Sequence, residues 1–227
     1  TAWDDWLAIA HRSRVVPAQS LEREHLYFCL QAAIDGIGGA MGYSPLVAPG
    51  HAAGQLVAPF GPLVLGTPDF DSIMPVLHAF QGKLDLTAFA FFSAKALAKL
   101  LARGDVPAPF ESECPFYALL EFEASTEEVA NEALATFEYC VEQGWVVDGV
   151  MSQSEQQLQN LWKLREYISE TISHWTPYKN DISVTVAQVP AFLHDIDAIV
   201  EANYPDFEVV WLGHIGDGNL HLNIFKP

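Results

Sequence analysis

The stretch that decides the fold is Trp211-Leu-Gly-His214-Ile-Gly-Asp217-Gly218-Asn219-Leu-His221-Leu-Asn223, near the end of a chain of 227 residues. Asp217-Gly218 predicts a tight hairpin turn, because glycine tolerates the positive φ angle that such turns need. The connection is too short for the helical crossover that parallel strands require, so the strands on either side of it pair antiparallel. The sequence therefore predicts a mixed or antiparallel sheet.

Side chains beyond the turn alternate between the two faces of their strand. Three apolar side chains point toward a core: Leu220, Leu222 and Ile224. Three polar ones form the opposite face: Asn219, His221 and Asn223. His214 lies at the mouth of the incoming strand, so we expect the hairpin to bring its imidazole close to that of His221.

Two neutral histidines on a rigid hairpin are half of a metal site, and imidazole suits zinc or manganese. A third oxygen or nitrogen ligand would have to come from elsewhere in the chain. The alternative is that His214 and His221 only make the hydrogen bonds of the turn.

Outward from the hairpin, short apolar strands alternate with longer helices from residue 63 onward, and this alternation is typical of the α/β (α+β) class. The predicted strands are 63–65, 86–92, 116–122, 146–151, 182–186 and 207–212, and the predicted helices are 70–80, 94–102, 125–143, 154–172 and 190–202. We expect the helices to lie on one face of the sheet.

The first sixty residues predict a small separate α/β segment. Its predicted helices are 2–11 and 22–35, and its extended pieces are 15–19, 40–47 and 55–60. The stretch from Pro59 to Pro68 is rich in proline and glycine, which favours a boundary there. The predicted domains are therefore 1–62 and 63–227.

Acidic residues dominate the composition. The chain has 29 Asp and Glu against 11 Lys and Arg, a net charge of −18. This charge excludes a nucleic-acid binder with a broad basic surface and disfavours docking on anionic membranes. After residue 60 the counts are 24 acidic and 8 basic residues, so the few cations in this part stand out.

Cysteine usage and the absence of targeting patterns predict a cytoplasmic protein. The three cysteines, Cys29, Cys114 and Cys140, form no CxxC pair, which favours reduced thiols. No charged-then-apolar leader follows Thr1, and no apolar run approaches the roughly 20 residues of a membrane helix.

A second group of polar residues lies on the predicted helix 154–172 and just after it. Arg165 and Ser169 are four residues apart, on one face of that helix, and Lys179 leads into the next strand. An arginine fork and a lysine point charge are what a small carboxylate substrate needs. The alternative is ion pairs within the protein, made with Glu166, Glu170 or Asp181.

The hairpin stretch Gly213-His214-Ile-Gly-Asp217-Gly218-Asn219-Leu-His221 resembles the signature of the C-terminal domain of FAD-linked oxidases. This family has the vanillyl-alcohol-oxidase fold and includes D-lactate and D-2-hydroxyglutarate dehydrogenases and glycolate oxidase subunits. Three further segments resemble the family in the same order: Pro115-Phe-Tyr-Ala-Leu-Leu-Glu121, Leu161-Trp-Lys-Leu-Arg165-Glu166, and Tyr178-Lys179 with Asp181-Ile-Ser183. The resemblance covers roughly residues 63–227 and is nearest to the D-2-hydroxyglutarate dehydrogenase branch.

The resemblance implies a cap domain that binds substrate and metal over FAD, in an enzyme that oxidises a 2-hydroxy acid to the 2-oxo acid by hydride transfer to the flavin. It implies a divalent metal, zinc or manganese, on His214 and His221, and we expect His221 to be catalytic as well. It implies substrate contacts at four positions: Arg165, Ser169, Lys179 and Asn223. The metal would polarise the 2-hydroxyl group, and a base would take its proton.

Two parts of the family pattern are not found in this sequence. An FAD-binding domain should precede the resembling segment, and a Ser-Ala-Glu-His-Gly-like stretch with a further metal ligand should follow it. We therefore expect the chain to be inactive alone, with a small 2-hydroxy acid, a separate FAD-binding chain or a second copy of itself as partners, and with neither nucleic acid nor membrane.

The first sixty residues resemble a different family, the effector-binding domain of LysR-type regulators. The resembling segments are Leu30-Gln-Ala-Ala-Ile-Asp35-Gly36-Ile-Gly38, Ser44-Pro-Leu-Val-Ala48 and Ala53-Gly54-Gln-Leu-Val-Ala-Pro59-Phe60. No winged helix-turn-helix is present, so DNA binding does not carry over. Two families end to end indicate a chimera, and the alternative function is a non-catalytic small-molecule-binding or scaffold protein.

Overall fold

The structure is a computed structural model that describes residue 33 and residues 60–123, 127–152 and 155–227. The chain divides into two units, Thr1–Pro59 and Phe60–Pro227, and all but one of the described residues belong to the second. Apart from Ala33, which is helical, and Phe60, which begins β1, the elements predicted in the first sixty residues and the segment that resembles LysR-type regulators lie outside the described residues. The chimera and the scaffold function stay predictions.

Seven antiparallel strands form one sheet in the order β4-β1-β3-β2-β6-β7-β5. Their bounds are β1 Phe60–Thr67, β2 Leu86–Ser93, β3 Phe116–Glu123, β4 Asp148–Met151, β5 Tyr178–Ser183, β6 Glu208–His214 and β7 Asn219–Phe225. The α/β class, the antiparallel sheet and the terminal hairpin of β6 and β7 are therefore confirmed.

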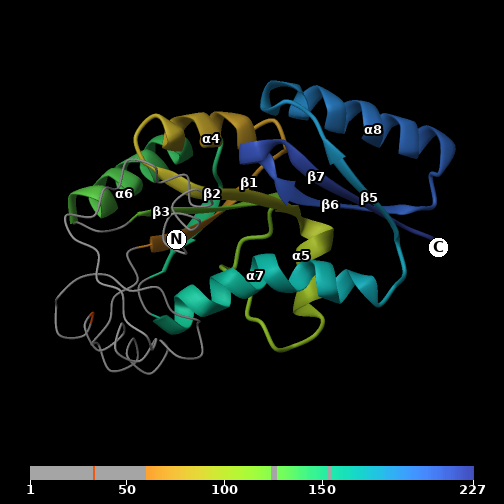
Figure 1. The fold of residues 1–227 in the computed structure, drawn as a ribbon, viewed down its shortest axis with the longest axis horizontal. Coiled ribbons are helices and arrows are strands. Elements are labelled where there is room, and N and C mark those ends of the chain that lie inside the picture. The colour runs from red at the N-terminus through yellow and green to blue at the C-terminus, as the bar shows by residue number, and fades with distance from the viewer. Residues whose placement is uncertain (1–32, 34–59, 124–126, 153–154) are drawn as a thin grey trace, which may run out of the picture. The chain divides into compact units, whose positions relative to one another are not determined.

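Helices cover both faces of this sheet, as Figure 1 shows. One face carries α4 (Ile73–Gln81), α6 (Glu127–Glu142) and α8 (Val189–Asn203), and the other carries α5 (Ala94–Leu101) and α7 (Glu155–Ser173). The prediction of helices on one face was wrong. Its cause is visible in β3, where the consecutive residues Ala118, Leu119 and Leu120 are all 0% exposed, so both faces of the strand must be covered.

Helix α7 brings the polar residues of the site to the sheet. Its apolar stripe is buried against α5 and β1 and consists of Leu161, Leu164, Ile168 and Ile172. Helical spacing then fixes where the remaining side chains of α7 can point. Among the described residues, no helix has the length and apolar character needed to cross a membrane.

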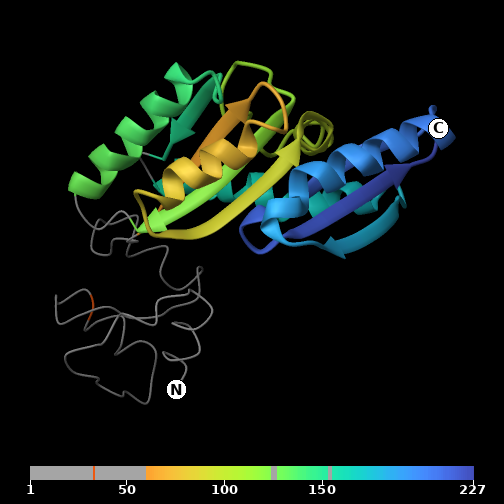
Figure 2. The same ribbon diagram turned by 90° about the horizontal axis from the view of Figure 1, so that it is seen from above.

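The sheet consists of two parts that meet between β2 and β6. We call this junction the seam, and only two residue pairs form it: Phe91 with Gly213, and Phe92 with Leu212. The strands β4-β1-β3-β2 lie on one side of the seam and β6-β7-β5 on the other (Figure 2). The candidate site lies at this seam.

The edge strand β5 differs from its prediction. The sequence predicted a strand at 182–186, whereas β5 spans Tyr178–Ser183. The prediction relied on alternating apolar residues, but β5 has one neighbouring strand and its side chains are largely exposed. An exposed edge strand needs no apolar alternation, so its polar sequence gave no strand signal.

Candidate functional site

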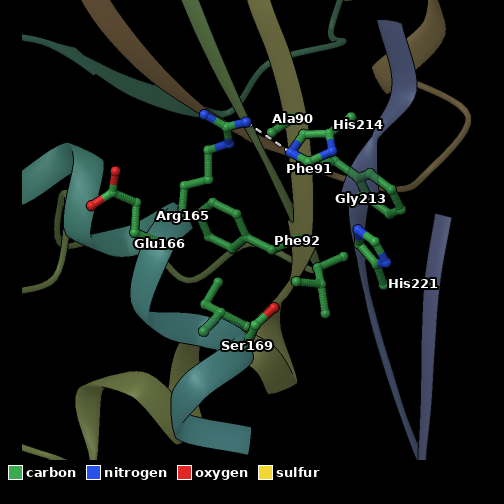
Figure 3. A pocket seen from close by; sticks show the side chains of 11 residues that line it. Ala90, Phe91, Phe92, Arg165, Glu166, Ser169, Gly213, His214 and His221 are labelled. Carbon is green, nitrogen blue, oxygen red and sulfur yellow. Dashed lines mark hydrogen bonds between the residues drawn. The ribbon is translucent and has the colours of Figure 1, made fainter. Parts of the chain in front are cut away.

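A pocket of about 300 Å³ opens at the seam between α7 and the β6–β7 hairpin. Its lining residues are Ala90, Phe91, Phe92, Arg165, Glu166, Ile168, Ser169, Leu212, Gly213, His214 and His221. Figure 3 shows Arg165 reaching from α7 toward His214, with His221 beside it on the hairpin. The pocket thus has an apolar floor and three nitrogen-bearing side chains at one end.

Two glycines allow the hairpin to bring its histidines together. Gly218 has φ +74°, and a Cβ atom there would collide with the carbonyl oxygen of Val184. At Gly213 a Cβ atom would collide with the carbonyl oxygen of Asn219, because β6 and β7 approach closely. The ring centroids of His214 and His221 are 5.9 Å apart, so the predicted approach of the two imidazoles is confirmed.

Arg165 and His214 are hydrogen-bonded, with 2.8 Å between the guanidinium Nη2 and the imidazole Nε2. A guanidinium can only donate, so Nε2 of His214 accepts and its ring carries hydrogen on Nδ1. Burial lowers the pKa of His214, and the positive charge of Arg165 lowers it further. His214 is therefore held in its neutral form.

Arg165 is itself held in place by its own helix. Its guanidinium carbon lies 5.2 Å from the centroid of the Trp162 ring, a cation–π distance. The bond to His214 uses one of the five N–H donors of the arginine. A planar cation half-buried at the end of a small pocket suits a carboxylate.

His221 is fixed from the side away from the pocket. Its Nδ1 lies 2.5 Å from Oδ1 of Asp181, on the neighbouring strand β5. A carboxylate accepts, so Nδ1–H of His221 donates, and in the neutral ring Nε2 keeps its lone pair. From the sequence, Asp181 was expected only as a structural ion-pair partner. No local sequence pattern signals a role beside His221, because the register of β5 and β7 sets this pairing.

The structure brings four of the six predicted site residues into one pocket: Arg165, Ser169, His214 and His221. Lys179 does not line it, and its Nζ donates to Oγ of Ser173 at 2.6 Å. Asn223 is only 3% exposed and donates from Nδ2 to the carbonyl oxygen of His221. The roles of all six in catalysis and binding stay predictions.

The histidine pair does not fit a metal ion as it is arranged. The lone pair on Nε2 of His214 already accepts a hydrogen bond from Arg165. Of the two imidazoles, only His221 therefore has an Nε2 lone pair that could bind a metal. Within the described residues, no three His, Cys, Asp or Glu side chains come close enough together to hold a metal. Zinc or manganese therefore stays a prediction.

The described part of the chain matches a known protein family. Residues 62–227 match the model of the C-terminal domain of FAD-linked oxidases, and the chain belongs to this family. The matched residues begin two positions into β1 and run to the end of the chain, so they include the whole pocket.

Several curated relatives share this part of the chain. The D-2-hydroxyglutarate dehydrogenase of Stutzerimonas stutzeri is 86% identical over 165 residues, which are 73% of this chain and 36% of that protein. The enzyme of the same name from Xanthomonas citri is 50% identical over 169 residues, 74% of this chain and 36% of its own. The mitochondrial D-2-hydroxyglutarate dehydrogenase of Danio rerio is 32% identical over 167 residues, 72% of this chain and 31% of its own.

This chain thus spans about a third of the length of the relatives that it matches. Among solved structures, p-cresol methylhydroxylase with substrate bound aligns with a TM-score of 0.43 and 8% identity, over 74% of this chain and 39% of that one.

Proposed function

We propose that this chain binds and orients the substrate in a flavin-dependent dehydrogenase of D-2-hydroxy acids, and that D-2-hydroxyglutarate is the substrate. The observation that carries the proposal is the pairing, in one pocket, of the Arg165 guanidinium with an imidazole of His221 whose Nε2 keeps its lone pair. The names of the relatives support the choice of acid.

The pocket suits the size and charge of such an acid. Its volume of about 300 Å³ is at the lower end of ligand sites, so it fits a small acid and is too small for FAD. Arg165 is a local cation in a part of the chain where acidic residues outnumber basic ones 24 to 8. This contrast favours an anion at the pocket over the surrounding surface.

Arg165 and His221 divide the work on the substrate. The guanidinium binds the C1 carboxylate through parallel N–H donors. This places the neighbouring 2-hydroxyl group at Nε2 of His221, which accepts its hydrogen. When the O–H bond breaks, an N–H bond forms at Nε2 and the imidazole becomes positively charged. FAD would supply the acceptor for the hydride of C2, so that the product would be the 2-oxo acid.

Lys179 binds the distal carboxylate of a dicarboxylic substrate. Arg165, Ser169 and Ser173 follow one another at four-residue spacing along α7, and the Lys179 ammonium lies on the last of them. Two helix turns separate Arg165 from Ser173, about 12 Å along the axis. Both cationic side chains are long, so reaching inward along this polar track would bring them toward the two ends of a five-carbon diacid.

Calorimetric titration of the chain with D-2-hydroxyglutarate tests the proposal. We expect Arg165→Ala to weaken binding about ten- to a hundredfold, as expected for loss of a hydrogen-bonded charge pair. Lys163→Ala removes a cation from the same helix outside the pocket and should bind like the original. Equal affinities for the two variants would contradict the proposed site.

A further inference from the structure

We propose that Asp181 is a positioning residue for His221: it holds the ring with hydrogen on Nδ1, so that the lone pair on Nε2 faces the pocket. Its meaning for the reaction rests on the proposed function. The tautomer itself does not, because contacts within the described structure set it.

The register of two strands places the carboxylate beside the ring. Asp181 is the direct partner of His221 in the β5–β7 ladder, so their side chains lie on the same face of the sheet. Oδ1 of Asp181 and Nδ1 of His221 are 2.5 Å apart, within hydrogen-bond distance, and the carboxylate makes the bond charge-assisted. Since both backbones are fixed by the ladder, the ring cannot turn away without losing this bond.

Stability does not explain the contact. The Asp181 side chain is 81% exposed, against 27% for His221. Ion pairs that are this open to water contribute little to folding. Lys179, two residues earlier on the same face of β5, is directed to Ser173 instead of Asp181. What the carboxylate does change is which nitrogen of His221 is free.

A neutral imidazole has one N–H and one lone pair, and its two tautomers exchange them. A carboxylate can only accept, so it stabilises the tautomer that directs N–H toward it. The lone pair is then on Nε2, which is the nitrogen that a hydroxyl donor in the pocket meets.

Long-range ¹H–¹⁵N NMR of the histidine-labelled chain at about pH 8.5 reads the tautomer directly. We expect the spectrum of His221 to show hydrogen on Nδ1 in the original chain and a large population with hydrogen on Nε2 in Asp181→Ala. Asp181→Asn keeps an acceptor oxygen but loses the charge, and should give a smaller change.

A second carboxylate–histidine pair provides the control. His194 Nε2 lies 2.8 Å from Oδ1 of Asp71, and neither residue lines the pocket. Asp71→Ala should alter the signals of His194 and leave those of His221 unchanged. An unchanged His221 tautomer in Asp181→Ala, in a chain whose backbone amide spectrum is otherwise preserved, would overturn the proposal.

Calorimetry with D-2-hydroxyglutarate on the same samples separates this proposal from the proposed function. If the tautomer depends on Asp181 and affinity falls severalfold in Asp181→Ala, both stand. If the original chain binds no acid, the proposed function fails while the tautomer result still decides the role of Asp181. If the acid binds and the tautomer does not respond to Asp181, the positioning role alone fails.

Discussion

The guanidinium of Arg165 donates to Nε2 of His214 across 2.8 Å and so connects α7 to the end of β6. The two residues are 49 positions apart in the sequence, one on a helix and the other at the end of a strand. The bond requires a neutral His214, and protonation of that ring would set two positive charges against each other. The stability of this contact therefore depends on pH.

The pH dependence of stability should reveal this contact. The pKa of His214 is lowered in the folded chain, so between that lowered value and the ordinary value of 6.5 the unfolded chain binds more protons. The free energy of unfolding should therefore fall as the pH falls below 6.5. In His214→Gln, urea unfolding at acidic and at alkaline pH should show a smaller loss on acidification.

His194 should contribute to the pH dependence of stability with the opposite sign. Its hydrogen bond to Asp71 raises its pKa, so its contribution is fully present below 6.5 and is lost as the pH rises through the raised value. In His194→Gln the loss of stability on acidification should become larger, although only slightly, since the pair is exposed. A change of the same sign in both variants would contradict the assignment.

Substrate length tests the place of Lys179. We expect Lys179→Ala to weaken binding of D-2-hydroxyglutarate about two- to tenfold, the effect of one exposed charge. Binding of D-lactate, which has no distal carboxylate, should not change. Lys226→Ala removes another exposed cation, which lies over Tyr178, and calorimetry should show no effect on the binding of either acid. Weaker binding of both acids to Lys179→Ala would mean that this lysine contacts the C1 carboxylate and not the distal one.

Metal binding can be tested on the two pocket histidines. Two imidazoles hold a divalent ion weakly, and an ion on Nε2 of His214 must displace Arg165. We therefore expect weak zinc or manganese binding that disappears in the His214→Ala/His221→Ala double variant, measured by calorimetry and metal analysis. His194→Ala should bind these metal ions as the original chain does. Equal occupancy in all three chains would contradict a metal role for the hairpin.

The hairpin glycine Gly218 should not tolerate a side chain. Its φ angle is +74°, and Gly104 has a similar φ of +79°. The backbone strain of an alanine, about 1–2 kcal/mol, is thus common to both positions. A Cβ atom at Gly104 meets open space, whereas at Gly218 it would collide with the Val184 carbonyl. Urea unfolding should show a clearly larger loss for Gly218→Ala than for Gly104→Ala, and equal losses would argue against this turn geometry.

The apolar stripe of α7 should dominate the stability of its face of the sheet. Leu164 is 0% exposed, and truncation of such a residue leaves a cavity. Leu164→Ala should lower the free energy of unfolding by about 2–5 kcal/mol. Leu134, which is 47% exposed on α6, gives the matched control, and Leu134→Ala should cost no more than about 0.5 kcal/mol. Similar values for the two variants would contradict the packing of α7.

The sequence predicted most of the described elements because their signals are local. Asp217-Gly218 specifies the hairpin, and the alternation after it specifies which face is polar. The stripe of α7 follows from helical spacing of leucine and isoleucine. These patterns depend on neighbours along the chain, so they can be read without knowledge of the fold.

The errors and omissions concern relations between distant segments. Periodicity does not distinguish a sheet covered on one face from one covered on both, and the polar edge strand β5 carries no apolar pattern. The pairing of Arg165 with His214 depends on how α7 packs over the seam. Asp181 meets His221 only through the β5–β7 register, which no local pattern in the sequence specifies.

The narrow seam has a consequence for hydrogen exchange. Only two residue pairs join β2 to β6, whereas β2 and β3 are joined along nearly their whole length. We therefore expect the strands β6, β7 and β5 to open as a cooperative unit at a lower free energy than the rest of the sheet. Such an opening would separate both histidines from Arg165 while the other four strands stay folded. A ligand that bridges Arg165 and His221 would slow amide exchange in β5, β6 and β7, strands whose backbones it need not touch.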